Sequence, residues 1–145
     1  MLFQKTNIPA VARPLDLLSF DSIKENFYFF FDARRDWDEI VAKAACSVHV
    51  DSTRVGMEGI LWPELRDCRV IVVANKQRND AVYFSGIRVD QLLLFLKRMG
   101  YPAALVSFVE ENRARLDHLL YDVGFDYRME GKELRILKSG YYVYF

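Results

Sequence analysis

The residues that could do chemistry in this sequence are few and scattered. His49 alternates with valines, as a partly exposed strand histidine would, and His118 falls off the leucine positions around it. Cys46 and Cys68 form no CxxC pair, so neither a zinc site nor a disulfide framework is predicted, and we interpret both as core residues. No serine or cysteine has the adjacent base that a nucleophile requires. The sequence therefore shows no zinc-binding pattern and no local pattern of a nucleophile with its base.

The segment 32–39 concentrates charge and has two interpretations. It holds four carboxylates and two arginines: Asp32, Arg34, Arg35, Asp36, Asp38 and Glu39. Such a group could bind a metal or a basic partner. Ordinary charge pairing at a helix junction is the simpler interpretation.

Composition predicts one globular domain spanning 1–145. Of the 145 residues, 52% are hydrophobic, enough to bury a substantial core. Lys plus Arg equals Asp plus Glu at 20 each, so nothing indicates a nucleic-acid partner. No apolar run approaches the ~20 residues of a membrane span, and no signal peptide is visible. We expect a soluble protein of the cytoplasm.

Capping signals and hydrophobic periodicity predict the helices and strands of the first half of the chain. Segment 11–14 suits an edge strand, and Ser22 with Glu25 forms a capping box for a helix that buries Phe27, Phe30 and Phe31. Asp36 with Glu39 predicts a second helix, through Ala44. Strands are then expected at 47–50, 55–62 and 69–74, the last being the most apolar.

In the second half a polar connection, 75–80, precedes a helix that begins at Asp80 or at Val89 and stops at Gly100. The run 103–109 reads as a buried strand, and Asn112 as the cap of a helix that ends at Gly124. A hairpin with Gly131 in its turn and a closing strand from Tyr141 to Phe145 follow. This order predicts an α/β protein: a mixed, mostly antiparallel sheet flanked by about four helices.

The order of elements resembles the GNAT (Gcn5-related N-acetyltransferase) superfamily. Ala12-Arg13-Pro14, followed by Asp21 and Ile23, is similar to the opening of many members. The run from Asn112 to Gly124-Phe125 is similar to the family's late N-x-x-A-x-x-L-Y-x-x-x-G-F pattern. The resemblance implies a GNAT-like single domain.

The resemblance also implies where acetyl-CoA would bind. Family members hold its pyrophosphate on backbone amides of a Q/R-x-x-G-x-G/A turn at a helix N-terminus. The corresponding residues are Gln77, Arg78, Asn79, Asp80, Ala81 and Val82. Asp80 and Val82 replace the small residues, so the cofactor loop is expected to be lost. If acetyl-CoA does bind, Gln77, Arg78, Asn79, Ala81, Val82 and Asn112 are the expected contacts.

The catalytic residues that the resemblance implies are displaced as well. The family's acid, a tyrosine four residues before Gly-Phe, falls here on Leu120, and the tyrosine is one residue later at Tyr121. One residue is a rotation of about 100° on a helix. Glu58 and Glu64 are candidate bases by location alone. Tyr121 and Glu58 are therefore the candidate catalytic pair if the chain is an enzyme.

Two hypotheses follow. In the first, a GNAT-fold protein has lost acyl transfer and serves as a structural or binding component, similar to small GNAT-like internal-virion or assembly proteins of short-tailed bacteriophages. Its partner, or a second copy, would contact the aromatic runs from Phe27 to Phe31 and from Tyr141 to Phe145. Burial of both runs is the alternative. In the second hypothesis the chain is an active acetyl-CoA-dependent N-acetyltransferase with a divergent loop.

Overall fold

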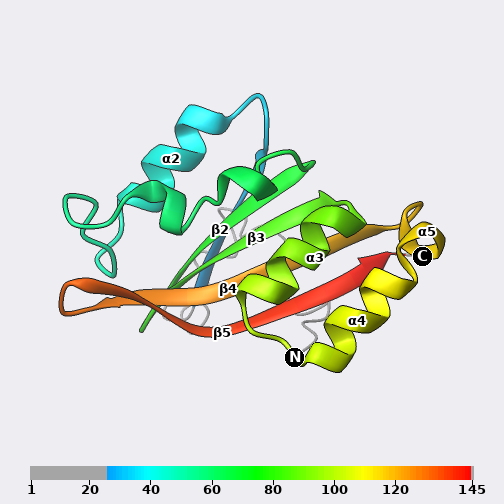
Figure 1. The fold of residues 1–145 in the computed structure, drawn as a ribbon. Helices are drawn as coiled ribbons and strands as arrows, with labels where there is room; N and C mark the ends of the chain where they lie inside the picture. Colours follow the sequence, from blue (N-terminus) through cyan, green and yellow to red (C-terminus); the bar gives the residue numbers. More distant parts are fainter. Residues whose placement is uncertain (1–25, 145) are drawn as a thin grey trace.

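A five-stranded antiparallel sheet forms the centre of the protein (Figure 1). The computed structural model describes residues 26–144. Strands β1 (Asn26–Asp32), β2 (Val70–Lys76), β3 (Asp80–Ile87), β4 (Leu120–Glu130) and β5 (Glu133–Tyr144) lie in sequence order, and every neighbouring pair is antiparallel. The predicted α/β class with a mostly antiparallel sheet is confirmed.

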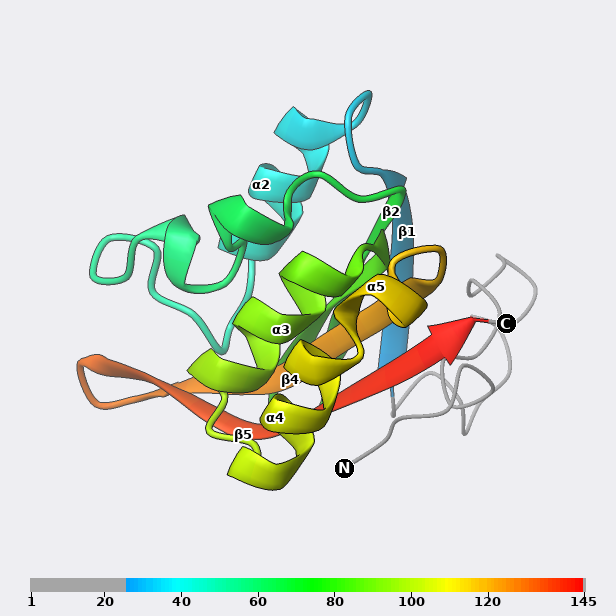
Figure 2. The same ribbon diagram turned by 45° about the vertical axis from the view of Figure 1, so that its right-hand side comes forward.

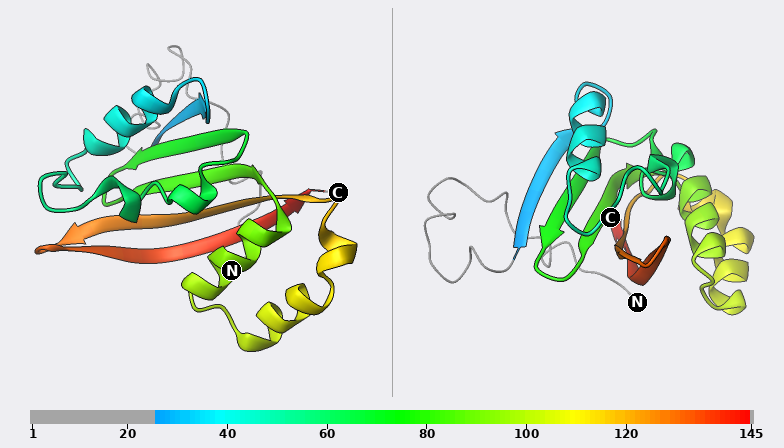
Figure 3. Two further views of the ribbon diagram at one scale, coloured as in Figure 1. Left: turned by 45° about the horizontal axis from the view of Figure 1, so that its top comes forward. Right: turned by 90° about the vertical axis from the view of Figure 1, so that its left-hand side faces the viewer.

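The helices cover one face of this sheet (Figures 2 and 3). The described residues form four α-helices: α2 (Trp37–Ala45), α3 (Val89–Arg98), α4 (Ala103–Glu111) and α5 (Arg113–Leu116). Two short 3₁₀ helices, η3 (Met57–Gly59) and η4 (Pro63–Leu65), lie between α2 and β2. The predicted number of helices, about four, is confirmed.

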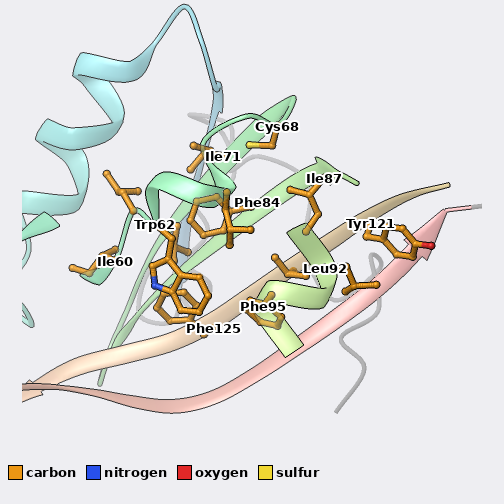
Figure 4. Close-up of a cluster of buried hydrophobic side chains, with 14 of the residues drawn as sticks. Ile60, Trp62, Cys68, Ile71, Phe84, Ile87, Leu92, Phe95, Tyr121 and Phe125 are labelled. Atoms are coloured by element: carbon orange, nitrogen blue, oxygen red, sulfur yellow. The ribbon is translucent and has the colours of Figure 1, made fainter. Parts of the chain in front are cut away.

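The main core lies between the helices and the sheet, and Trp62 is at its centre (Figure 4). The Trp62 ring lies 5.7 Å from the Phe95 ring of α3 and 5.4 Å from the Phe125 ring of β4. These contacts connect the 55–65 segment to both layers. On the opposite face a smaller cluster gathers around Tyr28, Val72, Ala74 and Ala81.

Several predicted elements are confirmed. Helix α2 begins directly after Asp36 and has Glu39 in its first turn, although the Asp36 side chain forms no capping hydrogen bond. The run 69–74 becomes β2, and the helix before Gly100 begins at Val89 rather than at Asp80. Gly100 and Gly131 have φ angles of 70° and 65°, the left-handed conformation expected of a helix stop and a hairpin turn. The β4–β5 hairpin turns where predicted.

The prediction of a helix over 22–31 is wrong where it can be compared, because Asn26–Asp32 is strand β1. Every residue from Phe27 to Phe31 is aromatic. A strand can pack such rings on both faces of the sheet, whereas a helix would bury only one stripe of them. The capping box at Ser22 and Glu25, the strand at 11–14 and the resemblance at 12–23 lie outside the described residues.

Two further strands are wrong. Segment 47–50 is a turn in which Val48 is 96% exposed while Val50 is buried. Segment 55–62 contains η3 instead, and Pro63 opens η4. The connection at 75–80 shortens to 77–79, because β2 continues to Lys76 and β3 begins at Asp80.

The predicted strand at 103–109 is helix α4, and the predicted helix from Asn112 is only the single turn of α5 followed by β4. Gly124 is therefore no helix stop. It lies in the middle of β4 opposite Tyr83, where an added Cβ would come within 2.3 Å of the Tyr83 ring. The closing strand expected from Tyr141 is the end of β5 rather than a separate strand, because Ser139 and Gly140 continue β5.

Candidate functional site

The hydroxyl of Tyr121, the candidate general acid, is buried and hydrogen-bonded to the backbone. Tyr121 lies at the start of β4 and is only 3% exposed (Figure 4). Its hydroxyl donates a hydrogen bond of 3.0 Å to the Leu116 carbonyl. Burial, with a smaller contribution from the Asp117 carboxylate, raises the pKa of Tyr121 above its ordinary value. A proton donor needs access to a substrate atom, and this hydroxyl is already engaged with the backbone.

The two candidate bases lie in the segment between α2 and β2. Glu58 is exposed within η3. Glu64 accepts two hydrogen bonds from the Arg98 guanidinium, at 2.9 and 3.2 Å, which lower the pKa of its carboxyl. Glu64 therefore links η4 to α3. Neither carboxylate forms a hydrogen bond with Tyr121.

The predicted cofactor residues form a turn between two strands. Gln77 and Arg78 are exposed at the tip, and the Asn79 side chain donates to the Asp80 carbonyl at 2.9 Å. Ala81 and Val82 are fully buried in β3. No helix begins after this turn, so there are no open helix amides beside it to receive a pyrophosphate.

The helix that could supply such amides, α3, begins at the other end of β3. Eight residues of extended strand separate the turn from Val89, which is roughly 25 Å. Asn112, the remaining cofactor residue, lies between α4 and α5 and donates from its side chain to the Phe108 carbonyl at 2.8 Å. The structure therefore does not bring the predicted cofactor and catalytic residues together in one site.

The two aromatic runs lie at the two edges of the sheet. The run from Phe27 to Phe31 is β1, and the run from Tyr141 is the end of β5. Among residues 26–144 no strand pairs with the outer side of either edge. Phe145 is not among the described residues.

Exposure differs between the two faces of β1. Phe27, Phe29 and Phe31 are half-buried on the helix-covered face, where the Lys43 ammonium lies 3.9 Å from the Phe29 ring centroid. On the other face Tyr28 is 8% exposed and Phe30 is 39% exposed. The run is thus partly buried, with Phe30 the most accessible ring.

A buried polar cluster was missed by the sequence analysis. The Asp80 carboxylate is 1% exposed and accepts hydrogen bonds from the Ser47 hydroxyl and, at 3.1 Å, from the Asn75 amide. Tyr127 is paired with Asp80 across the sheet, and its buried hydroxyl has no hydrogen-bond partner. The alternation of β3 could have revealed that Asp80 shares a face with Val82, but not that residue 47 would reach it.

The other candidates of the sequence have structural contacts. His49 Nε2 donates to the Lys76 carbonyl at 2.9 Å, and His118 is exposed. Asp32 accepts from the amides of Arg35 and Arg34, which lowers the pKa of its carboxyl. Within residues 26–144 no group of three or more His, Cys, Asp or Glu side chains could hold a metal ion.

Comparisons with protein-family models, with curated proteins and with solved structures found no match. In the described part of the chain, no helix has the length and apolar character needed to cross a membrane. The functional proposal therefore rests on the geometry of the site residues and of the sheet edges.

Proposed function

We propose that this chain is a non-catalytic binding protein on a GNAT-like fold, and that it accepts an extended segment of a partner protein along the outer edge of β1. The observation that carries the proposal is an aromatic edge strand without charges. From Phe27 to Phe31 every residue is aromatic, and the strand is bounded by Asn26 and Asp32. The resemblance to small phage proteins supports a place in a particle or in its assembly.

Edge strands expose unpaired N–H and C=O groups, and soluble proteins usually protect them with charges, proline or bulges. β5 has such protection in Glu133, Arg135 and Lys138, and a register shift interrupts its pairing with β4 between Asp126 and Tyr127. β1 has none of these between its ends. An added strand would gain backbone hydrogen bonds along β1 and a contact with the exposed Phe30 ring.

The positions of the candidate catalytic residues support the loss of acyl transfer. The Tyr121 hydroxyl donates to the Leu116 carbonyl, and the turn at Gln77 is a strand's length away from α3. An acyltransferase needs its acid, base and cofactor cradle within reach of one substrate. Acetyl-CoA titration by calorimetry tests this part: we expect no heat of binding at millimolar cofactor, and micromolar affinity would favour the alternative, an active N-acetyltransferase.

The edge is tested with two matched variants. Phe30→Lys places a charge on β1, and Ile136→Lys places one on β5 at a residue that is also 39% exposed. Sedimentation velocity over a concentration series detects pairing with a second copy, and selection from a displayed random-peptide library detects extended partners. We expect Phe30→Lys to abolish the association or peptide binding and Ile136→Lys to preserve it. Equal effects of both, or a monomer for which the library yields no β1-dependent peptide, would refute the proposal.

A further inference from the structure

A pocket of about 390 Å³ at one end of the sheet is lined by three arginines, Arg34, Arg69 and Arg88, and by two carboxylates, Asp32 and Asp67. The Asp32 carboxylate is already bonded to the backbone amides of Arg34 and Arg35. The pocket lies at the end marked by Cys68 in Figure 4, which is also among its lining residues. Of the three arginines, only Arg34 belongs to the charged segment 32–39 of the sequence. Arg69 and Arg88 are far from it in the chain, and no local pattern joins the three arginines.

The antiparallel meander brings the three arginines together. Asp32 at the end of β1 pairs with Val70, and Val70 pairs with Ser85 near the end of β3. Arg34 follows β1, Arg69 precedes β2, and Arg88 lies between β3 and α3. The end of one strand, the start of the next and the end of the third therefore meet at one point.

Two of the guanidinium groups already hold one carboxylate. Arg34 Nη2 lies 3.3 Å from Asp67 Oδ1, and Arg88 Nη2 lies 3.3 Å from Asp67 Oδ2. The bonds are long and the side chains exposed, so this pairing is weak and open to competition from solution. It nevertheless shows that both guanidinium groups reach the two oxygens of a single anionic group.

Arg69 has no such partner. Among residues 26–144 its guanidinium forms no hydrogen bond or ion pair, while its aliphatic stem packs beside Gly86. A Cβ at residue 86 would lie 2.9 Å from Arg69 Cγ, and Gly86 has a φ of 83°. A glycine here thus lets the Arg69 stem lie against the chain, with its charge at the pocket.

We propose that this pocket binds the phosphate group of a small ligand, held by Arg34, Arg69 and Arg88 after displacement of the Asp67 carboxylate. A phosphate has more negative charge and more acceptor oxygens than a carboxylate, and the arginine fork matches it. Arg66 lines an adjoining pocket that shares Arg34 and Asp67, which extends the positive field. The positive end of α3, a helix of ten residues, begins directly after Arg88.

The test is an amide-resolved NMR titration of the full chain with inorganic phosphate at constant ionic strength, with sodium chloride in the reference. We expect saturable shifts confined to the pocket. Arg69→Gln should weaken binding at least about fivefold, because one charge-assisted contact is lost from an exposed site. Asp67→Asn should tighten binding, because it removes the competing carboxylate.

Arg78→Gln is the matched control, since it removes an exposed arginine at the opposite end of β3. Its phosphate affinity should equal that of the unchanged chain, and thermal unfolding checks that each variant folds. A parallel titration with adenosine monophosphate distinguishes a free ion from an esterified phosphate; saturable binding of either supports the site. The proposal is overturned by shifts that do not saturate or that chloride reproduces, or by an Asp67→Asn variant that binds more weakly. Weaker binding by Asp67→Asn would mean that the ion pairs of Asp67 with Arg34 and Arg88 only connect neighbouring loops.

Discussion

Removing the Tyr127 hydroxyl should make the protein more stable. The Tyr127 side chain is fully buried, and its oxygen has no hydrogen-bond partner. A buried polar group left unpaired costs about 1–3 kcal/mol, and the small void left by one oxygen atom offsets part of the gain from its removal. We therefore expect Tyr127→Phe to raise the free energy of unfolding by about 1 kcal/mol, which is a rise in melting temperature of roughly 3–5 °C.

Tyr121→Phe is the matched control. It removes the same atom from a second buried tyrosine of β4, but that hydroxyl donates to the Leu116 carbonyl at 3.0 Å. Loss of this bond should cost about 0.5–1.5 kcal/mol. The two substitutions are chemically identical, so opposite signs would isolate the effect of hydrogen bonding.

Urea unfolding followed by tryptophan fluorescence measures both variants, with unchanged m-values as the check that only stability has moved. The difference should also depend on pH. Burial, together with the Asp80 carboxylate, raises the pKa of Tyr127 above its usual 10.0. Above pH 10.0, the ordinary pKa of tyrosine, the unfolded chain releases this proton and the folded chain keeps it. The free energy of unfolding of the wild type therefore falls as the pH rises, and the stability advantage of Tyr127→Phe grows. A Tyr127→Phe variant as destabilised as Tyr121→Phe would refute the reasoning and point to an internal water between Tyr127 and Asp80.

A glycine substitution and a thiol modification test the packing of the core. Gly124→Ala should destabilise the protein by about 2 kcal/mol or more, because its Cβ would meet the Tyr83 ring at 2.3 Å and the Val82 carbonyl at 2.8 Å. Gly59→Ala, whose Cβ would have its nearest neighbour at 3.5 Å, should cost far less in the same urea unfolding assay. Iodoacetamide at pH 8 should modify the exposed Cys46 and leave Cys68 unmodified until the protein unfolds, because burial raises the pKa of the Cys68 thiol to about 12. Equal rates of modification in the folded protein would contradict this burial.

The α4–β4 region shows why part of the fold was mispredicted. The run 103–109 is short and apolar, and such a run suits a buried strand and a helix equally well. Its inward residues, Leu105, Val106 and Val109, follow the helical spacing i, i+1, i+4. The helical spacing of Leu116, Leu119, Leu120 and Val123 after Asn112 was coincidental, because residues from Leu120 onward form β4, which pairs with both β3 and β5.

The candidate site residues were expected in the wrong secondary structure. Tyr121 was expected on a helix and Gln77 in a turn at a helix N-terminus, but Tyr121 lies on β4 and Gln77 lies in the turn between β2 and β3. The arginine pocket had no local signature in the sequence. The aromatic run of β1 was noted, but only strand order places it at an edge.

Local signals in the sequence determined the α/β class, the large core, helix α2, strand β2, the stop of α3 at Gly100 and the turn at Gly131. These follow from hydrophobic periodicity, glycine conformation and composition, which act within a few residues. Tertiary structure alone decided that Asn26–Asp32 is an edge strand, that Gly124 lies beneath Tyr83, and that Arg34, Arg69 and Arg88 meet. Strand pairing joins residues that are distant in the chain, and a short aromatic or apolar run does not specify which partner it will find.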